Sequence, residues 1–184
     1  MNTPSNPHHD LTPSPWVVRF AHLVPAGARV LDLACGYGRH ALFFAARGAQ
    51  VIAIDRDAPA LATLAARSGI ESRLADLEGS PWPLAGERFD AVVVTNYLWR
   101  PLWPALQASL ADGAVLIYET FAVGNEAFGK PSNPDFLLRR GELLEACRGL
   151  HVVAYEDGWL DDPPRCVQRM AAINAPAAGA LFAL

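Results

Sequence analysis

Short apolar runs alternate with helical patterns along most of this chain, and this alternation constrains the fold more than any other feature. Five runs are expected as strands: 29–34, 50–55, 70–75, 89–95 and 113–119. Most of them are nearly continuous apolar runs rich in Val, Ile and Leu, and 70–75 is the most polar. Strands of nearly continuous apolar sequence are typical of parallel sheets, because helices cover both faces of such sheets. The sequence therefore predicts an open, doubly wound α/β fold.

Helical patterns fill the intervals between these strands. Ser14 followed by Pro15 gives an N-cap with proline at the first helical position, which predicts a helix over 14–23. Further helices are expected over 39–47, 58–67, 101–110 and 141–148. The last alternating runs, 151–156 and 165–173, are too close in sequence for a helical crossover and are expected to pair antiparallel. The prediction is a Rossmann-like sheet of seven strands, five parallel plus a C-terminal antiparallel hairpin, with helices on both faces.

Length and composition indicate one domain and exclude several classes of protein. The chain has 184 residues, 52% hydrophobic and 18% charged, with a formal net charge of −4. We assign a flexible arm to 1–13 and a single domain to 14–184. The acidic balance disfavours a nucleic-acid surface, and the apolar runs are too interrupted for a membrane span. The start lacks the charged n-region and apolar h-region of a secretory signal, so a cytoplasmic location is expected. The expected oligomeric state is a monomer or a homodimer.

The three cysteines do not indicate a disulfide bond or a structural metal site. Cys35, Cys147 and Cys166 are odd in number and lack the CxxC spacing of a zinc site. Neither a disulfide framework nor a bound metal is therefore expected.

The turn after the first predicted strand holds the most informative motif. The sequence Asp32-Leu33-Ala34-Cys35-Gly36-Tyr37-Gly38 leads from that strand into the helix at 39–47. Its two glycines permit a tight turn and close approach of a ligand, and the start of the helix offers free N–H groups. Asp55 ends the second strand, where a carboxylate can accept both hydroxyls of a ribose. The order strand, glycine turn, helix, strand, acid predicts a site for a nucleotide-type cofactor.

More than one class of protein fits this order. Gly36 to Ala41 matches G-x-G-x-x-A, the fingerprint of a nicotinamide-nucleotide-binding oxidoreductase. Against it, Asp32 lies just before the turn, no downstream domain for a nicotinamide is evident, and Asp76 ends the third strand where it could bind a purine amino group. A non-catalytic, cofactor-binding regulatory domain is a further alternative, motivated by Ala34 and by the lack of an evident general base.

These motifs resemble those of the class I S-adenosylmethionine-dependent methyltransferases. The segments VLDLACGYGRHALFFAARG, VIAIDRD, ADLEGSPWPL and FDAVVVTNYLW carry the resemblance, which extends over residues 14–173. It is strongest to small bacterial single-domain members that resemble the tellurite-resistance methyltransferase branch. The first glycine of the family's D-x-G-x-G-x-G pattern is Ala34 in this chain.

The resemblance implies S-adenosylmethionine as the cofactor and suggests a role for each matching position. In the family, the strand-one acid lies near the methionine ammonium, and the loop backbone holds the methionine moiety. The strand-two acid takes the ribose hydroxyls, the strand-three acid meets the adenine edge, and the end of strand four faces the sulfonium. The cofactor-binding residues expected on this basis are Asp32, Ala34, Gly36, Gly38, Asp55, Arg56, Asp76, Leu77, Thr95 and Asn96.

Methyl transfer is an in-line displacement, so the enzyme mainly aligns the reacting atoms and excludes water. Tyr97, Arg100 and Glu119 are the candidate catalytic residues, since they follow the strand ends on the ligand side. For Glu119 the alternative is a strand-end charge in solvent. Asn96-Tyr97 is followed by Leu98-Trp99 rather than by Pro-Pro-Tyr, which disfavours methylation of DNA adenine or of glutamine.

The segment 121–139 is long, without periodicity and unusually aromatic for a linker. Loops of this length in a compact domain are generally lids or binding loops. We expect an ordered cover over the acceptor site. The sequence as a whole predicts an S-adenosylmethionine-dependent methyltransferase that acts on a small-molecule acceptor.

Overall fold

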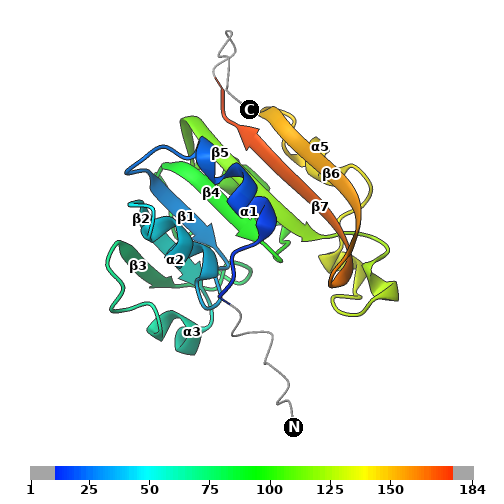
Figure 1. Ribbon diagram of the computed structural model, residues 1–184, viewed down its shortest axis with the longest axis horizontal. Coiled ribbons are helices and arrows are strands. Elements are labelled where there is room, and N and C mark those ends of the chain that lie inside the picture. Colours follow the sequence, from blue (N-terminus) through cyan, green and yellow to red (C-terminus); the bar gives the residue numbers. More distant parts are fainter. Residues whose placement is uncertain (1–10, 176–184) are drawn as a thin grey trace.

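The fold is a single mixed sheet, described here for residues 11–175 of a computed structural model. Its seven strands lie in the order β3-β2-β1-β4-β5-β7-β6 (Figure 1). The strands β1 to β5 run parallel, and β7 pairs antiparallel with both β5 and β6. Their bounds are β1 Arg29–Leu33, β2 Gln50–Asp55, β3 Ile70–Leu74, β4 Phe89–Thr95, β5 Leu110–Phe121, β6 His151–Asp161 and β7 Pro164–Ile173. The predicted Rossmann-like sheet with its C-terminal hairpin is confirmed.

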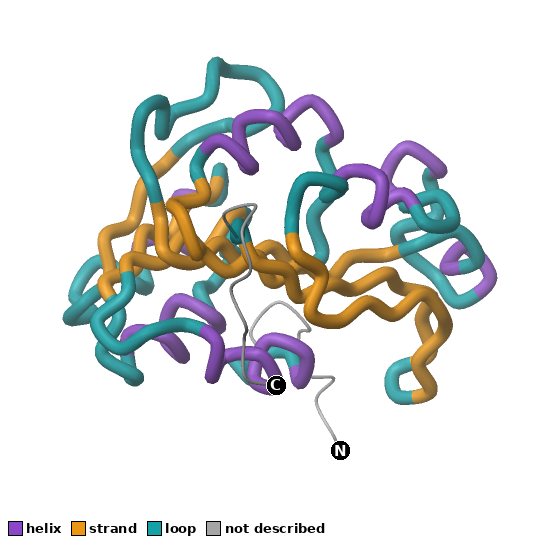
Figure 2. Tube along the Cα trace, turned by 90° about the horizontal axis from the view of Figure 1, so that it is seen from above, coloured by secondary structure: helices purple, strands orange, loops and turns teal. Residues whose placement is uncertain are grey.

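Helices cover both faces of the sheet (Figure 2). They are α1 Pro15–Phe20, α2 Arg39–Ala45, α3 Ala58–Ala62, α4 Trp103–Ala108 and α5 Glu142–Ala146. On one face, buried side chains of α1, α2 and α3 pack against the strands, with Trp16 and Phe44 among the largest. On the other face, Leu106 of α4 and Leu143 of α5 join a second buried cluster. The sheet thus separates two apolar cores, as a parallel sheet requires.

The first helix is short and is held at both its cap and its first aromatic residue. The Ser14 Oγ accepts a hydrogen bond from the Trp16 amide at 3.2 Å, with Pro15 at the first helical position. The Trp16 indole, 1% exposed, donates to the Met170 carbonyl of β7 at 3.1 Å. A 3-10 turn over Ala21–Leu23 completes the helix predicted at 14–23. This docking carries the chain before α1 to the end of the sheet where the predicted site lies.

Several predicted lengths differ from the structure: the first strand of the hairpin, predicted over 151–156, runs to Asp161, and the helices predicted over 101–110 and 141–148 are shorter. Two further differences have a visible physical cause. The helix predicted over 58–67 ends at Ala62, where the Thr63 hydroxyl donates to the Ala60 carbonyl at 2.7 Å. Such back-bonding by threonine offers the backbone an alternative to the helix. The strand predicted over 113–119 extends from Leu110 to Phe121, because it pairs with β4 at one end and with β7 at the other. Cross-strand partners of this kind leave no mark in the local sequence.

The segment 121–139 is ordered, as predicted. A bridge between Ala122 and Leu138 closes it, and two 3-10 turns, Asn125–Ala127 and Pro134–Phe136, fold the part between. Leu137 and Leu138 are buried, while Phe128 and Phe136 are exposed.

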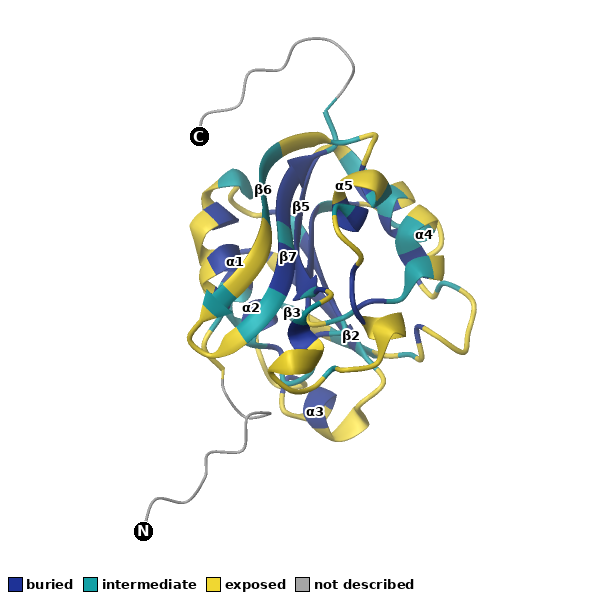
Figure 3. Ribbon diagram, turned by 90° about the vertical axis from the view of Figure 1, so that its right-hand side faces the viewer, coloured by how far each residue is buried: buried dark blue, intermediate teal, exposed yellow. Residues whose placement is uncertain are grey.

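Figure 3 shows the buried central strands beside the exposed strand β6. The part of the chain described has no helix long and apolar enough to cross a membrane.

Candidate functional site

The predicted glycine turn follows β1 and adopts backbone angles that most residues avoid. Gly36 and Gly38 have φ values of +53° and +75°, and Ala34 joins them at +53°. A Cβ atom on Gly38 would lie 2.5 Å from Cδ1 of Leu64, whereas one on Gly36 would meet nothing within 4 Å. Gly38 therefore permits close packing of α2 against the segment after α3. Gly36 leaves the outer side of the turn open to a ligand.

Ala34 is strained where the resembling family has glycine. We expect Ala34→Gly to raise the free energy of unfolding by about 0.5–1 kcal/mol, because the left-handed conformation costs an L-residue about 1–2 kcal/mol and glycine returns part of that through its freer unfolded chain. Equilibrium urea denaturation measures the change. Gly36→Ala, at the same φ and in open space, is the matched control and should destabilise. A less stable Ala34→Gly variant would show that the Ala34 methyl group packs well enough to outweigh the strain.

Asp55 ties the glycine turn to the end of β2. Its Oδ2 accepts a hydrogen bond from the Gly36 amide at 2.8 Å, and its Oδ1 accepts one from the Asp57 amide at 2.9 Å. Each carboxylate oxygen keeps a further acceptor site, because an ionised carboxylate has about four lone-pair positions. The group can thus hold the turn and still accept two hydroxyl donors.

A small cavity of about 130 Å³ opens beside the turn, at the ends of β2 and β3. We call it the β2–β3 cavity; it is lined by Ala34, Asp55, Arg56, Ala75, Asp76, Leu77, Glu78 and Tyr97. Of the eight cofactor-binding residues expected at the ends of β1, β2 and β3, five line this recess, and Asp32, Gly36 and Gly38 do not. Hydrogen bonds from the Glu78 and Gly79 amides lower the pKa of Asp76, so it carries a negative charge there. The Tyr97 hydroxyl is buried and has no hydrogen-bond partner among the described residues.

Asp32 lies beneath the turn and is 1% exposed. Burial raises its pKa to about 7, although the Ala41 amide donates to Oδ2 at 2.8 Å and Arg39 lies nearby. Its Oδ1 faces the His40 ring at 4.0 Å. Burial and Arg39 lower the pKa of His40 to about 3, so this ring is neutral near pH 7. A carboxylate this poorly solvated is poised to gain from a nearby cation.

A larger cavity of about 500 Å³ lies at the carboxyl ends of β4 and β5. We call it the β5–β7 cavity. Its walls are the segment 12–15 before α1, part of the loop 121–139, and the turn of the β6–β7 hairpin at 162–165. Its charged and polar lining residues include Arg39, Asn96, Glu119, Lys130, Asp162 and Arg165. Asn96 and Tyr97 are consecutive residues after β4, and each lines one of the two cavities.

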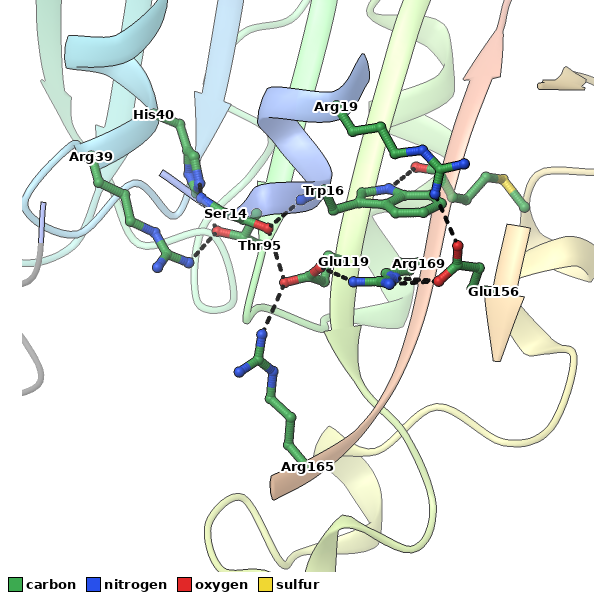
Figure 4. Close-up of polar contacts among 11 residues, drawn as sticks. Ser14, Trp16, Arg19, Arg39, His40, Thr95, Glu119, Glu156, Arg165 and Arg169 are labelled. Carbon is green, nitrogen blue, oxygen red and sulfur yellow. Dashed lines mark hydrogen bonds and ion pairs between the residues drawn. The ribbon is translucent and has the colours of Figure 1, made fainter. Parts of the chain in front are cut away.

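Glu119 is buried in this second cavity rather than exposed as a strand-end charge, which corrects the alternative considered from the sequence. It is 2% exposed. Its Oε1 accepts a hydrogen bond from the Ser14 hydroxyl at 3.2 Å and lies 3.9 Å from Arg165 (Figure 4). Its Oε2 lies 3.6 Å from Arg169 and accepts no hydrogen bond within the described chain. The carboxylate thus balances two guanidinium groups and keeps one oxygen free.

Ser14 connects this carboxylate to the helix behind the glycine turn (Figure 4). Its amide donates to His40 Nε2 at 3.1 Å, which leaves the ring proton on Nδ1. That nitrogen lies 3.4 Å from the Thr95 hydroxyl, which also accepts from Arg39 at 3.5 Å. Thr95, expected beside the sulfonium, is therefore used to hold His40 and Arg39.

Arg100 lines neither cavity. Its guanidinium pairs with Glu142 through Nε at 2.6 Å and Nη2 at 2.9 Å, and it donates to the carbonyls of Asp135 and Leu137. Burial alone would raise the pKa of Glu142, but hydrogen bonds from Arg100 and Arg139 lower it to about 2. Arg100 is thus an anchor of the loop 121–139, and the structure does not bring this expected catalytic residue to either cavity. Tyr97, also expected at the acceptor, lines the β2–β3 cavity instead.

Sequence reasoning missed three residues of the β5–β7 cavity. Arg39 directly follows the glycine turn, so its position carried a signal. Ser14 was interpreted only as a helix cap, yet it also contacts Glu119 and His40. Arg165 lies next to Pro163 and Pro164 in a hairpin turn, and nothing local marks it as part of a site. Thr12 and Pro13, assigned to the flexible arm 1–13, also line the cavity; residues 1–10 of that arm lie outside the described part.

Comparisons with known proteins agree on one family. A family model described as a methyltransferase domain matches residues 30–113. A ubiquinone biosynthesis O-methyltransferase of Xanthomonas axonopodis pv. citri (strain 306) is 41% identical over 101 residues, which cover 52% of this chain and 41% of that protein. The chain thus spans less than half the length of this curated relative.

Solved methyltransferase structures share the fold. TehB from Haemophilus influenzae superposes with a TM-score of 0.71 at 21% identity, over 85% of this chain and 60% of that one. A S-adenosylmethionine-dependent methyltransferase from Methanosarcina mazei gives 0.70 at 15% identity, over 89% and 99% of the two chains. A TehB-like S-adenosylmethionine-dependent methyltransferase from Corynebacterium glutamicum gives 0.64 at 16% identity and covers 85% of each chain.

The residues present fit S-adenosylmethionine, the cofactor of this family. The turn is open above Gly36, and the Asp55 carboxylate keeps acceptor capacity beside the β2–β3 cavity. At the same cavity, the buried Tyr97 hydroxyl has no hydrogen-bond partner in the described chain, and the ionised Asp76 carboxylate keeps acceptor capacity for a ligand. No cluster of three or more metal-ligating side chains occurs among residues 11–175. Residues 30–113 thus match a methyltransferase domain, and the described chain shares the fold of solved S-adenosylmethionine-dependent methyltransferases, TehB among them.

Proposed function

We propose that this chain transfers the methyl group of S-adenosylmethionine to a small-molecule acceptor bound in the β5–β7 cavity. The observation that carries the proposal is the meeting of two cavities at the end of β4. Tyr97 lines the cavity suited to adenosine, and the preceding residue, Asn96, lines the larger one. A cofactor that extends from one cavity along the glycine turn would present its methyl group to the other.

The sulfonium supplies an activated methyl group, so the protein's own contribution is alignment and exclusion of water. We propose that Asp55 and Asp76 hold the ribose and adenine, with Arg56 and Leu77 along the adenine. The loop backbone at Ala34, Gly36 and Gly38 would hold the methionine moiety above Asp32. Phe121, Phe128 and Lys130 of the loop 121–139 line the β5–β7 cavity, which supports the proposed role of that loop as a lid.

Calorimetric titration with S-adenosylhomocysteine and with a reduced nicotinamide cofactor tests the cofactor half of this proposal. We expect saturable binding of the first and none of the second. Transfer of labelled methyl from S-adenosylmethionine to small molecules of a cell extract tests turnover. A folded sample that binds neither S-adenosylmethionine nor its product would contradict the proposal. Binding without any transfer would favour the regulatory alternative.

The pH dependence of cofactor binding should report the charge of Asp32. Its pKa of about 7 means that it must lose a proton to pair with the methionine ammonium, so affinity should rise with pH up to about 7 and then level off. Each pH unit below that value should weaken binding by up to about tenfold. Calorimetry with S-adenosylhomocysteine from about pH 5.5 to about 7.5 measures the slope.

Asp32→Asn is the matched variant, because it keeps an acceptor for the Ala41 amide and removes the titration. Its affinity should be lower at pH 7 and flat across the range. His40 does not contribute a slope, since burial lowers its pKa to about 3. An unchanged slope in Asp32→Asn would assign the pH dependence to another group.

A further inference from the structure

We infer that the acceptor of the β5–β7 cavity is a small organic acid that carries a hydrogen-bond donor. Its carboxylate would lie against Arg165, Lys130 and Arg39, and its donor would bind the carboxylate of Glu119. This inference rests on the proposed function and names the substrate class of the same site. It follows from the charged side chains around the cavity and from which of their polar atoms already make hydrogen bonds within the protein.

Arg169 is the cation near Glu119 that is already committed. It donates to Glu156 through Nε at 2.8 Å and Nη2 at 2.5 Å, and its guanidinium lies 4.7 Å from the centre of the Trp16 ring. Glu156 also pairs with Arg19 (Figure 4). This side of the network is satisfied within the protein and helps to fix Glu119 from behind.

Arg165 is the cation near Glu119 whose donors are not engaged in hydrogen bonds within the described chain. Its side chain is 21% exposed, yet its contact with Glu119, at 3.9 Å, is too long for a hydrogen bond. A guanidinium has five N–H donors, and burying them without acceptors is costly. None of these donors makes a hydrogen bond to residues 11–175. A carboxylate is the ligand whose geometry matches that fork with two parallel hydrogen bonds.

Two further cations converge on the same cavity from other segments. Lys130 comes from the loop 121–139, where it is exposed at the rim, and Arg39 comes from the start of α2. The long hydrogen bond from Arg39 to Thr95 leaves most of its donors free. Of the two lining carboxylates, Asp162 is exposed and Glu119 is already flanked by two guanidinium groups. The interior of the cavity therefore favours an anion.

Glu119 indicates that the acceptor also carries a hydrogen-bond donor. Its Oε2 is buried, accepts no hydrogen bond in the described chain, and belongs to a residue that lines the cavity. Glu119 also lies beside Thr95 in the β4–β5 pairing, next to the strand end where the methyl group would arrive. An O–H or N–H group of the acceptor would reach this carboxylate from the side of Oε1, which lies near Arg165 and keeps a further acceptor position, and would be held near that point.

The test is calorimetry on the complex of the full chain with S-adenosylhomocysteine. The probes are glycolate, 3-hydroxybutyrate and salicylate, each compared with its neutral amide, and inorganic sulfate. We expect at least one hydroxy acid to bind at least about tenfold more tightly than its amide, because the amide cannot make charge-assisted hydrogen bonds. Arg165→Gln should remove this preference and Arg165→Lys should restore part of it. Arg148→Gln, an exposed position at the end of α5, should leave it unchanged.

Glu119→Gln provides the second readout. Wild type should prefer 3-hydroxybutyrate to butyrate, and this preference should weaken when the carboxylate that accepts the donor is lost. Hydroxy acids that bind no better than their amides, affinity unaffected by Arg165→Gln, or binding of sulfate alone would each overturn the inference. Failure of S-adenosylhomocysteine to bind would instead contradict the proposed function, so the two failures are distinguishable.

Discussion

Arg100→Ala is expected to lower the free energy of unfolding by about 3–5 kcal/mol, the usual cost of breaking a buried ion pair by removing one partner. The Glu142 side chain is 3% exposed, and Arg100 supplies two of its hydrogen bonds. The same guanidinium holds the Asp135 and Leu137 carbonyls, so the loop 121–139 loses its tie to the turn before α4.

Equilibrium urea denaturation measures this change, and two variants sharpen it. Arg139→Ala removes the other side-chain partner of Glu142, but the Arg139 side chain is 74% exposed, so its loss should cost no more than about 1 kcal/mol. Replacing Arg100 and Glu142 together with Met and Leu should recover much of the stability, since no charge is then left buried. A loss below about 1 kcal/mol for Arg100→Ala would mean that Glu142 finds another partner.

Asp55→Ala is expected to weaken binding of S-adenosylhomocysteine by at least about tenfold, the loss of one charge-assisted hydrogen bond, and by more if both are lost. Two hydroxyl donors to a carboxylate contribute about 1.5–3 kcal/mol each, and each 1.4 kcal/mol is a factor of ten. Calorimetry measures the affinity, with urea denaturation of the same sample as a check on folding.

The structure revises what this substitution should do to the ligand-free protein. A strand-end carboxylate facing a cleft would have few protein partners, but Asp55 accepts from the Gly36 and Asp57 amides. A loss of about 1 kcal/mol in stability is therefore expected in addition to the loss of affinity. Asp57→Ala is the matched control: it removes the N-cap of α3 at a similar cost in stability and should bind the cofactor product as wild type does. Equal affinities for Asp55→Ala and wild type would contradict the assigned site.

Much of the fold and the cofactor half of the site could be predicted from local sequence. Strands such as β2 and β4 are continuous apolar runs whose length the sequence states directly, and both were predicted with their observed bounds. The glycine turn and the acids Asp55 and Asp76 stand at strand ends, and parallel strand ends meet at one edge. The order of these residues along the chain is therefore enough to predict that they lie close together, and no distant contact needs to be known.

The β5–β7 cavity, which we propose as the acceptor site, could not be predicted in this way, because distant segments build it. The contact between Ser14 and Glu119 spans 105 residues, and that between Arg100 and Glu142 spans 42. Whether Arg100 faces a cavity or a buried glutamate depends on where α5 packs. The residues next to Arg100 in the sequence do not indicate that position. Arg165 reaches the site only because β7 lies between β5 and β6.

The way the two cavities draw on the chain bears on how such a protein diversifies. The family model covers 30–113, and every residue that lines the β2–β3 cavity falls inside that range. The β5–β7 cavity borrows most of its walls from outside it, in three short stretches at 12–15, 121–130 and 162–165. If the β5–β7 cavity holds the acceptor, as we propose, exchanging these three stretches between relatives should change acceptor selectivity and leave the residues of the β2–β3 cavity untouched.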